Sequence, residues 1–199
     1  MHTGPKVIAE VGLVGLPNAG KSTMLRALTR AHPKVADYPF TTLSPQLGIA
    51  AADASRKLIL ADIPGLIEGA ARGVGLGHDF LRHTERTRVL LHVLDAAPAD
   101  GSDPATNYRT VRDELAGYSS DLAGKPEVVA INKCDLLPDD DSRERAVRAL
   151  LAELQLGADT AVIATSGASG TGQEELLEAL WSRVHPKGGA AEGWAPACE

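Results

Sequence analysis

One nine-residue segment constrains the fold more than any other, GLPNAGKST from Gly15 to Thr23. It has the pattern GxxxxGK followed by serine, and it comes directly after VIAEVGLVG (7–15), an apolar run that predicts a buried strand. A helix is expected to begin at Lys21. The glycines permit a tight turn whose backbone N–H groups converge on phosphate oxygens at the positive end of that helix. The segment therefore predicts a phosphate-binding loop between a strand and a helix.

The side chains of this loop have distinct expected roles. Lys21 is expected to reach the β and γ phosphates of a nucleotide, and Ser22 to offer its hydroxyl to Mg²⁺. A chance glycine-rich turn is the alternative, which the combination of lysine, serine and preceding strand disfavours. We expect the whole loop to bind the nucleotide, namely Gly15, Leu16, Pro17, Asn18, Ala19, Gly20, Lys21, Ser22 and Thr23.

A second motif, DIPG (62–65), ends the predicted strand KLILAD (57–62). Asp62 is expected to hold Mg²⁺ through water, and the Gly65 amide to sense the γ phosphate. Alone the motif is weak, because Asp, Pro and Gly are ordinary turn residues. After a phosphate loop and a strand it becomes specific, so we include Ile63 and Pro64 with the nucleotide-binding residues.

A third motif, NKCD (132–135), ends the predicted strand EVVAIN (127–132). The Asp135 carboxylate could accept hydrogen bonds from the N1–H and the exocyclic amine of guanine, whereas adenine offers no such donor pair. Asn132 is expected to tie the loop together, and the Lys133 stem to cover one face of the base. A plain polar turn closing a strand is the alternative. The motif predicts guanine as the base.

The rest of the chain alternates between strand and helix patterns. Strands are expected at 47–53, 57–62, 89–95, 127–132 and 160–165, the first two forming a hairpin, and helices at 78–87, 108–122, 146–154 and 176–184. This rhythm predicts an α/β fold of the P-loop NTPase type. We expect a three-layer sandwich with a mainly parallel sheet of about six strands, helices on both faces, and ligands at the carboxyl ends of the strands.

Composition and charge exclude some partners. A net charge of −6 over 199 residues argues against broad DNA or RNA binding, which needs a surplus of basic residues on one face. No run approaches the ~20 apolar residues needed to cross a bilayer. The two cysteines, Cys134 and Cys198, suit a reducing compartment. We therefore expect a cytoplasmic protein, a monomer, without membrane contact.

Five segments together resemble the GTPase domain of the Obg family of translation-factor-class GTPases, over about 7–184: GLPNAGKST, DYPFTTL, DIPGLIEGA, GLGHDFLRHTERTRVLLHVLD and NKCD. The resemblance implies a Mg²⁺-dependent switch that binds GTP and GDP and hydrolyses GTP. For the parent architecture it also implies a role in assembling the large ribosomal subunit. That architecture normally carries a glycine-rich amino-terminal domain, and this sequence contains no such segment before the G domain. We therefore expect an isolated G domain at 1–187 with a flexible tail at 188–199.

The resemblance adds further site residues. It places 39–44 in the first switch loop, with Phe40 beside the nucleotide and Thr42 as a Mg²⁺ ligand, Thr41 being the alternative. In TSGAS (165–169), the residues expected against the base are Ser166, Gly167 and Ala168, with Gly167 in place of the family's usual alanine. A plain glycine turn is the alternative for this loop. The expected metal ligands are therefore Ser22, Thr42 and Asp62.

The expected catalytic residues are Asn18, Lys21, Thr42 and Gly65. Leu66 and Ile67 stand directly after Gly65, where the best-known GTPases keep a polar residue that orients water. Because phosphoryl transfer depends mainly on positioning and charge neutralisation, we expect slow hydrolysis rather than none.

Several groups could supply the missing positive charge. Asn18 is a candidate K⁺ ligand, with a plain loop-capping role as its alternative. Basic side chains near the second switch are candidates for an internal arginine finger, or for solvated charges and RNA contacts: Arg72, Arg82, Arg86 and Arg88. His78 and His83 as general bases are disfavoured, because the loose transition state does not require a base.

Two other function classes stay open. One is a nucleotide-sensing module with negligible turnover, in which GTP and GDP order or release the loops at 39–44 and 66–77. The other is a related ATPase, which the guanine-reading Asp135 disfavours.

Overall fold

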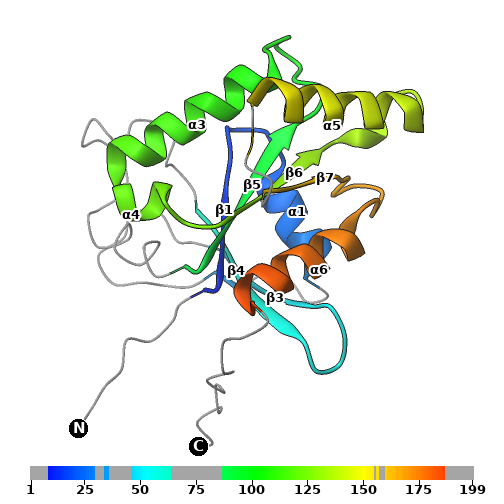
Figure 1. Ribbon diagram of the computed structural model, residues 1–199. Helices are drawn as coiled ribbons and strands as arrows, with labels where there is room; N and C mark the ends of the chain where they lie inside the picture. Colours follow the sequence, from blue (N-terminus) through cyan, green and yellow to red (C-terminus); the bar gives the residue numbers. More distant parts are fainter. Residues whose placement is uncertain are drawn as a thin grey trace, which may run out of the picture.

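A single seven-stranded sheet organises the part of the chain that the computed structural model describes, which is residues 9–29, 34–35, 46–63, 87–154, 156 and 160–186. The strand order is β2-β3-β4-β1-β5-β6-β7. Figure 1 labels all of these strands except β2. The strands are β1 (Val11–Val14), β2 (Lys34–Val35), β3 (Gln46–Ala51), β4 (Lys57–Asp62), β5 (Val89–Asp95), β6 (Glu127–Asn132) and β7 (Ala161–Ala164). β1 pairs in parallel with β4 and β5, and β6 and β7 continue in parallel, whereas β2 and β3 run antiparallel to their neighbours.

Helices cover both faces of this sheet, so the fold has three layers (Figure 1). α1 (Lys21–Leu28) and α6 (Gln173–Val184) pack on one face, and α3 (Pro104–Tyr118), α4 (Ser120–Ala123) and α5 (Asp140–Leu154) on the other. Because side chains alternate along a strand, Leu91 and Val93 of β5 join the α1 and α6 core, while Leu90 and Leu94 face the opposite helices. The fold predicted from the sequence is confirmed.

The prediction of one continuous helix from Tyr108 to Leu122 is wrong. Ser119 has an extended backbone (φ −153), which ends α3, and its hydroxyl accepts a hydrogen bond from the Leu122 amide at 3.3 Å, which begins α4. Serine is a preferred N-cap, so it starts a new short helix where apolar spacing alone predicts continuation.

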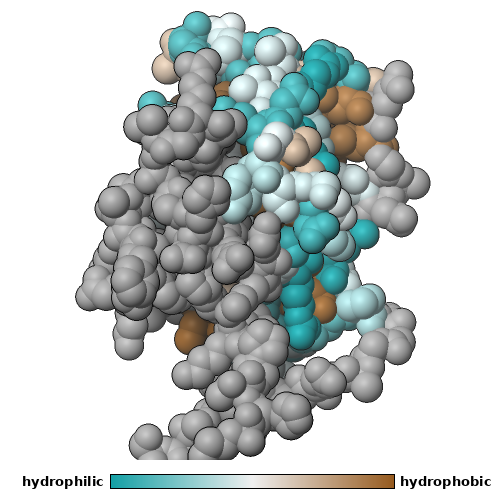
Figure 2. Space-filling model, turned by 90° about the vertical axis from the view of Figure 1, so that its left-hand side faces the viewer, coloured by the Kyte–Doolittle hydropathy of each residue, from teal (hydrophilic) through white to brown (hydrophobic). Residues whose placement is uncertain are grey.

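Seen from the α3 side, the described surface is largely hydrophilic (Figure 2).

Strand ends follow the predictions closely in the buried part of the sheet. The bounds of β4, β5 and β6 agree with the predicted 57–62, 89–95 and 127–132, whereas the first strand is only Val11–Val14. The two-residue β2 adds a strand that the sequence pattern does not predict. The expected helix at 78–87 lies outside the described residues except for Thr87, which is not helical, and the expected tail at 188–199 lies outside them entirely. None of the described helices is long and apolar enough to span a bilayer.

Candidate functional site

The loop Gly15–Thr23 follows the carboxyl end of β1, the central strand of the sheet. β1 lies between β4 and β5. Gly15 and Gly20 have positive φ angles of 151° and 96°. A Cβ on Gly15 would collide with the Val93 carbonyl oxygen, and one on Gly20 with the Asn132 side-chain nitrogen. Both positions therefore require glycine for close approach, and the loop lies at the topological switch point where this fold binds ligands.

Lys21 extends back over the loop from the first turn of α1. Its Nζ donates to the carbonyl oxygens of Gly15 at 2.9 Å and Leu16 at 3.1 Å. The first turn of α1 contains no acidic residue, so no side-chain carboxylate of that turn offsets the positive end of the helix. The ammonium group and the helix N-terminus together favour an anion here.

Ser22 and Asp62, which are 40 positions apart in sequence, meet beside this loop. Ser22 Oγ donates to Asp62 Oδ2 at 2.7 Å, which joins the first turn of α1 to the end of β4. Asp62 is only 5% exposed, and its buried Oδ1 accepts no hydrogen bond from any described residue. A buried carboxylate oxygen without a partner is costly unless a cation or water satisfies it. The hydroxyl and carboxylate oxygens fit Mg²⁺, which is bound by few protein ligands together with phosphate and water.

Asn132 connects three segments of the site. The residue is 2% exposed, its side-chain Nδ2 donates to the Ala19 carbonyl at 2.9 Å, and its Oδ1 accepts from the Gly167 amide at 3.0 Å. The phosphate loop, the NKCD turn and the 165–169 loop are therefore held together by one buried amide group.

Lys133 and Asp135 flank the buried Cys134 in the NKCD turn. Lys133 has a left-handed backbone (φ 63), and its Nζ lies 2.6 Å from Asp95 Oδ2. Asp135 is the exposed middle residue of the short 3₁₀ segment Cys134–Leu136. On the other side of the turn, Arg143 Nε donates to the Cys134 carbonyl at 3.1 Å.

The sequence does not predict that Asp95 and Arg143 contact the NKCD turn. Asp95 does carry a signal, because it is a polar residue that ends a buried strand, as Asp62 and Asn132 also do. Arg143 has no comparable signal. Its contact depends on how α5 packs beside the turn.

The loop that follows β7 is built around Ser166, which is fully buried. Its Oγ accepts from the amides of Ala168 at 3.2 Å and Ser169 at 2.9 Å. Gly167 packs against the first turn of α1, where a Cβ would lie 3.3 Å from both the Met24 nitrogen and Thr23 Cγ2. The glycine at this position thus relieves a moderately crowded contact.

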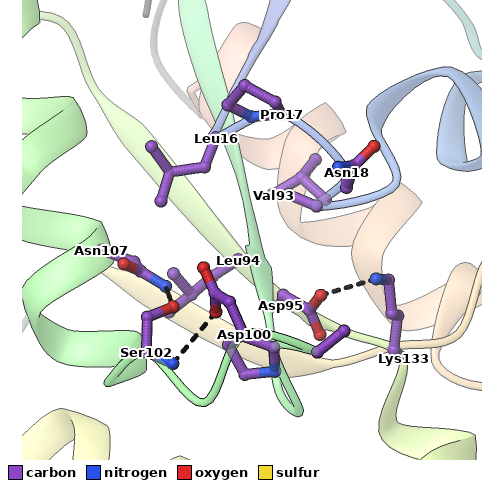
Figure 3. A pocket seen from close by; sticks show the side chains of 13 residues that line it. Leu16, Pro17, Asn18, Val93, Leu94, Asp95, Asp100, Ser102, Asn107 and Lys133 are labelled. Atoms are coloured by element: carbon purple, nitrogen blue, oxygen red, sulfur yellow. Dashed lines mark hydrogen bonds and ion pairs between the residues drawn. The ribbon is translucent and has the colours of Figure 1, made fainter.

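A cavity of about 180 Å³ adjoins the phosphate loop (Figure 3). Leu16, Pro17 and Asn18 form one wall, and Asp100 and Ser102 belong to the opposite wall. The Asp95–Lys133 ion pair borders the same space (Figure 3). Asn18, the candidate K⁺ ligand, is exposed and has a left-handed backbone (φ 65).

Several predicted residues lie outside the described part of the chain, namely Phe40, Thr41, Thr42, Pro64, Gly65, Leu66, Ile67, Arg72, His78, Arg82, His83 and Arg86. Arg88 is described and is wrong as a candidate finger. It precedes the amino end of β5, and the parallel pairing of β5 with β1 puts this end at the edge of the sheet opposite the phosphate loop.

The sheet order, the phosphate loop at its switch point and the Ser22–Asp62 pair define a P-loop nucleotide-binding protein. Residues 10–133 match a family described as 50S ribosome-binding GTPase. Over 179 residues the chain is 51% identical to GTPase Obg of Acidithiobacillus ferrooxidans, and this alignment covers 90% of the chain and 47% of that protein. It is 50% identical over 176 residues to GTPase Obg of a Synechococcus species, covering 88% and 44%. The chain therefore belongs to the 50S ribosome-binding GTPase family, and within it to the Obg GTPases.

The chain spans less than half the length of these curated relatives. Among solved structures it resembles a GDP-bound S. thermophilus NFeoB mutant, with a TM-score of 0.62, 23% identity, and 88% of this chain and 62% of that one covered. It also resembles the G domain of the T. maritima FeoB iron transporter, with a TM-score of 0.62, 21% identity, and 88% and 98% covered. At these identities the likeness concerns the fold alone.

Proposed function

We propose that this chain binds GTP and GDP together with Mg²⁺, hydrolyses GTP to GDP and phosphate slowly, and acts as a molecular switch. The observation that supports this most directly is the pair of hydrogen bonds made by Asn132, to the Ala19 carbonyl and from the Gly167 amide. These bonds join the phosphate-binding loop to the turn that carries Asp135. A ligand with phosphates at one end and a guanine base at the other matches that arrangement.

The base would be read by Asp135. Its carboxylate is exposed in the 3₁₀ segment, where it could accept from the N1–H and the exocyclic amine of guanine. A site built for such a donor pair rejects a base that lacks it, because the polar groups would be left unpaired. The residues proposed to line the base are Lys133, Gly167 and Ala168. Ser166, which the sequence also places against the base, is fully buried and would instead hold this loop through its hydroxyl.

Ser22 and Asp62 would hold Mg²⁺, with Thr42 as the further ligand that the sequence predicts. Asp62 accepts a hydrogen bond from the Ser22 hydroxyl at 2.7 Å, and its Oδ1 has no described partner, which supports the proposal of a cation here. The bound ion would neutralise charge on the β and γ phosphates. Lys21, whose Nζ lies over the loop, would add a second positive charge.

Hydrolysis would depend on positioning and on added positive charge. Lys21 is proposed to stabilise the transferring phosphoryl group, and the Gly65 amide to contact it, as the sequence predicts. Asn18, exposed in the loop, is proposed to hold K⁺ as a compensating charge. The partner that we propose is the large ribosomal subunit during its assembly, because the matched family is described as 50S ribosome-binding GTPase.

The test compares GDP with ADP by titration calorimetry in Mg²⁺ and then measures phosphate release from GTP. We expect GDP to bind, ADP not to bind, and turnover to be slow but measurable. Asp135→Asn should lose most GDP affinity, whereas Asp113→Asn, the same change at an exposed position on α3, should retain it.

Each alternative has its own signature in this experiment. Tighter binding of ADP than GDP would overturn the base assignment and favour the ATPase. GDP binding without any phosphate release, including in the presence of large ribosomal subunits, would favour the nucleotide-sensing module.

A further inference from the structure

Asp95 and Lys133 form an ion pair between the ends of neighbouring strands. Asp95 is opposite Asn132 in the parallel pairing of β5 with β6, so it lies beside the residue that precedes Lys133. The Lys133 Nζ is 2.6 Å from Asp95 Oδ2, and the two side chains are 31% and 12% exposed. The pair is therefore partly shielded from water, which strengthens it relative to an ion pair on an open surface.

Asp95 is itself held in place. Its Oδ1 accepts a hydrogen bond from the Ala97 amide at 2.9 Å, which leaves Oδ2 directed at the lysine. The strand that carries Asp95 is buried from Val89 to Leu94, so its backbone cannot readily shift. The Asp95 carboxylate is thus held in one position, and it restricts the conformation of the long Lys133 side chain.

The backbone of Lys133 shows why such a restriction matters. Among the described residues, only Asn18 and Lys133 are non-glycine residues with a positive φ, and both line the cavity beside the phosphate loop (Figure 3). A left-handed backbone is unfavourable for lysine, so contacts elsewhere must maintain it. The backbone of Lys133 fixes the position of its Cβ, and Asp95 fixes the position of its Nζ.

We propose that Asp95 is a positioning residue for guanine nucleotide binding, which acts by fixing the Lys133 stem as a wall for the base. The inference rests on the proposed function, because it needs a guanine nucleotide in the site. Without Asp95 the lysine would sample many rotamers, and binding would have to order it each time. GDP should then leave faster, because in this proposal Asp95 acts on the nucleotide through Lys133.

The test is a double-mutant cycle on the release rate of a fluorescent GDP analogue. Asp95→Asn keeps the shape but removes the charge, and we expect release about five- to tenfold faster, as for the loss of one ordinary hydrogen bond. Lys133→Met keeps an apolar stem without the ammonium group. In the Lys133→Met background, Asp95→Asn should have no further effect, because its only route to the nucleotide is gone. Asp113→Asn is the matched charge control and should release the analogue at the wild-type rate.

The outcomes separate this inference from the proposed function. If Asp95→Asn speeds release equally in both backgrounds, Asp95 has a general structural role and the inference is wrong. The same holds if Asp95→Asn releases the analogue at the wild-type rate. If the wild-type chain binds no GDP while remaining folded by circular dichroism, the proposed function itself fails.

Discussion

Replacing Asn132 by alanine should destabilise the protein even without nucleotide. Asn132 is 2% exposed, and its side-chain amide makes two hydrogen bonds, to the Ala19 carbonyl at 2.9 Å and from the Gly167 amide at 3.0 Å. Each bond contributes about 0.5–1.5 kcal/mol, and a buried partner left unsatisfied costs about 1–3 kcal/mol. We expect a loss of about 2–4 kcal/mol in the free energy of unfolding, with the upper part of this range reached only if water cannot enter the gap.

Urea denaturation of the nucleotide-free chain, followed by circular dichroism, measures this loss as a shift of the midpoint at constant slope. Asn107→Ala is the matched control, since Asn107 is only half-buried and its Nδ2 makes one bond, to Ser102 Oγ at 2.7 Å. It should cost about 1 kcal/mol or less.

A second variant separates the hydrogen bonds from simple packing. Asn132→Asp preserves the shape and the acceptor for the Gly167 amide but removes the donor to the Ala19 carbonyl. It should remain clearly destabilised, and its GDP affinity should fall by more than about tenfold, equivalent to 1.4 kcal/mol. A stable Asn132→Ala variant, with a loss under about 1 kcal/mol, would refute the view that this side chain holds the three segments together.

Three further predictions concern acid stability, the 165–169 loop and catalysis. Burial would raise the pKa of Glu127, but hydrogen bonds from His92 and Tyr108 and the charge of Arg112 lower it below its ordinary value of 4.5. The contribution of Glu127 to the free energy of unfolding should therefore be fully present above pH 4.5 and be lost as the pH drops through the folded pKa. Urea titrations at several pH values should show a shallower acid-induced fall in Glu127→Gln. Gly167→Ala should fold but raise the Kd for GDP about two- to fivefold by calorimetry, because its Cβ would lie 3.3 Å from the Met24 nitrogen. Single-turnover GTP hydrolysis should be faster in K⁺ than in Na⁺, and equal rates would exclude Asn18 as a K⁺ ligand.

The sequence predicts those elements of the fold whose signals are local. β5 and β6 are buried apolar runs that end in a polar residue, Asp95 or Asn132, so the sequence alone predicts their bounds. The break at Ser119 is missed because apolar spacing continues across it. β2 is missed because two residues have no periodicity.

The contacts of the candidate site are only partly predictable, because they depend on strand order. The motifs identify Ser22, Asp62 and Asn132, since each follows or ends a strand in a recognisable pattern. The Asp95–Lys133 pair requires knowing that β5 and β6 are neighbours, and the Arg143 contact requires knowing how α5 packs. Neither fact is encoded within one window of sequence.

The register of the sheet links the fold to the site. Leu13 pairs with Asp62 and Asp95 with Asn132, so the polar residues that end β4, β5 and β6 lie at the same edge as the phosphate loop. A slip of one residue would turn each side chain to the opposite face, and Asp62 would no longer meet Ser22. The apolar residues that precede these polar ends prevent such a slip, because Leu60, Leu94 and Ile131 would have to leave their cores. The packing of the strands is therefore what positions the candidate metal and nucleotide ligands.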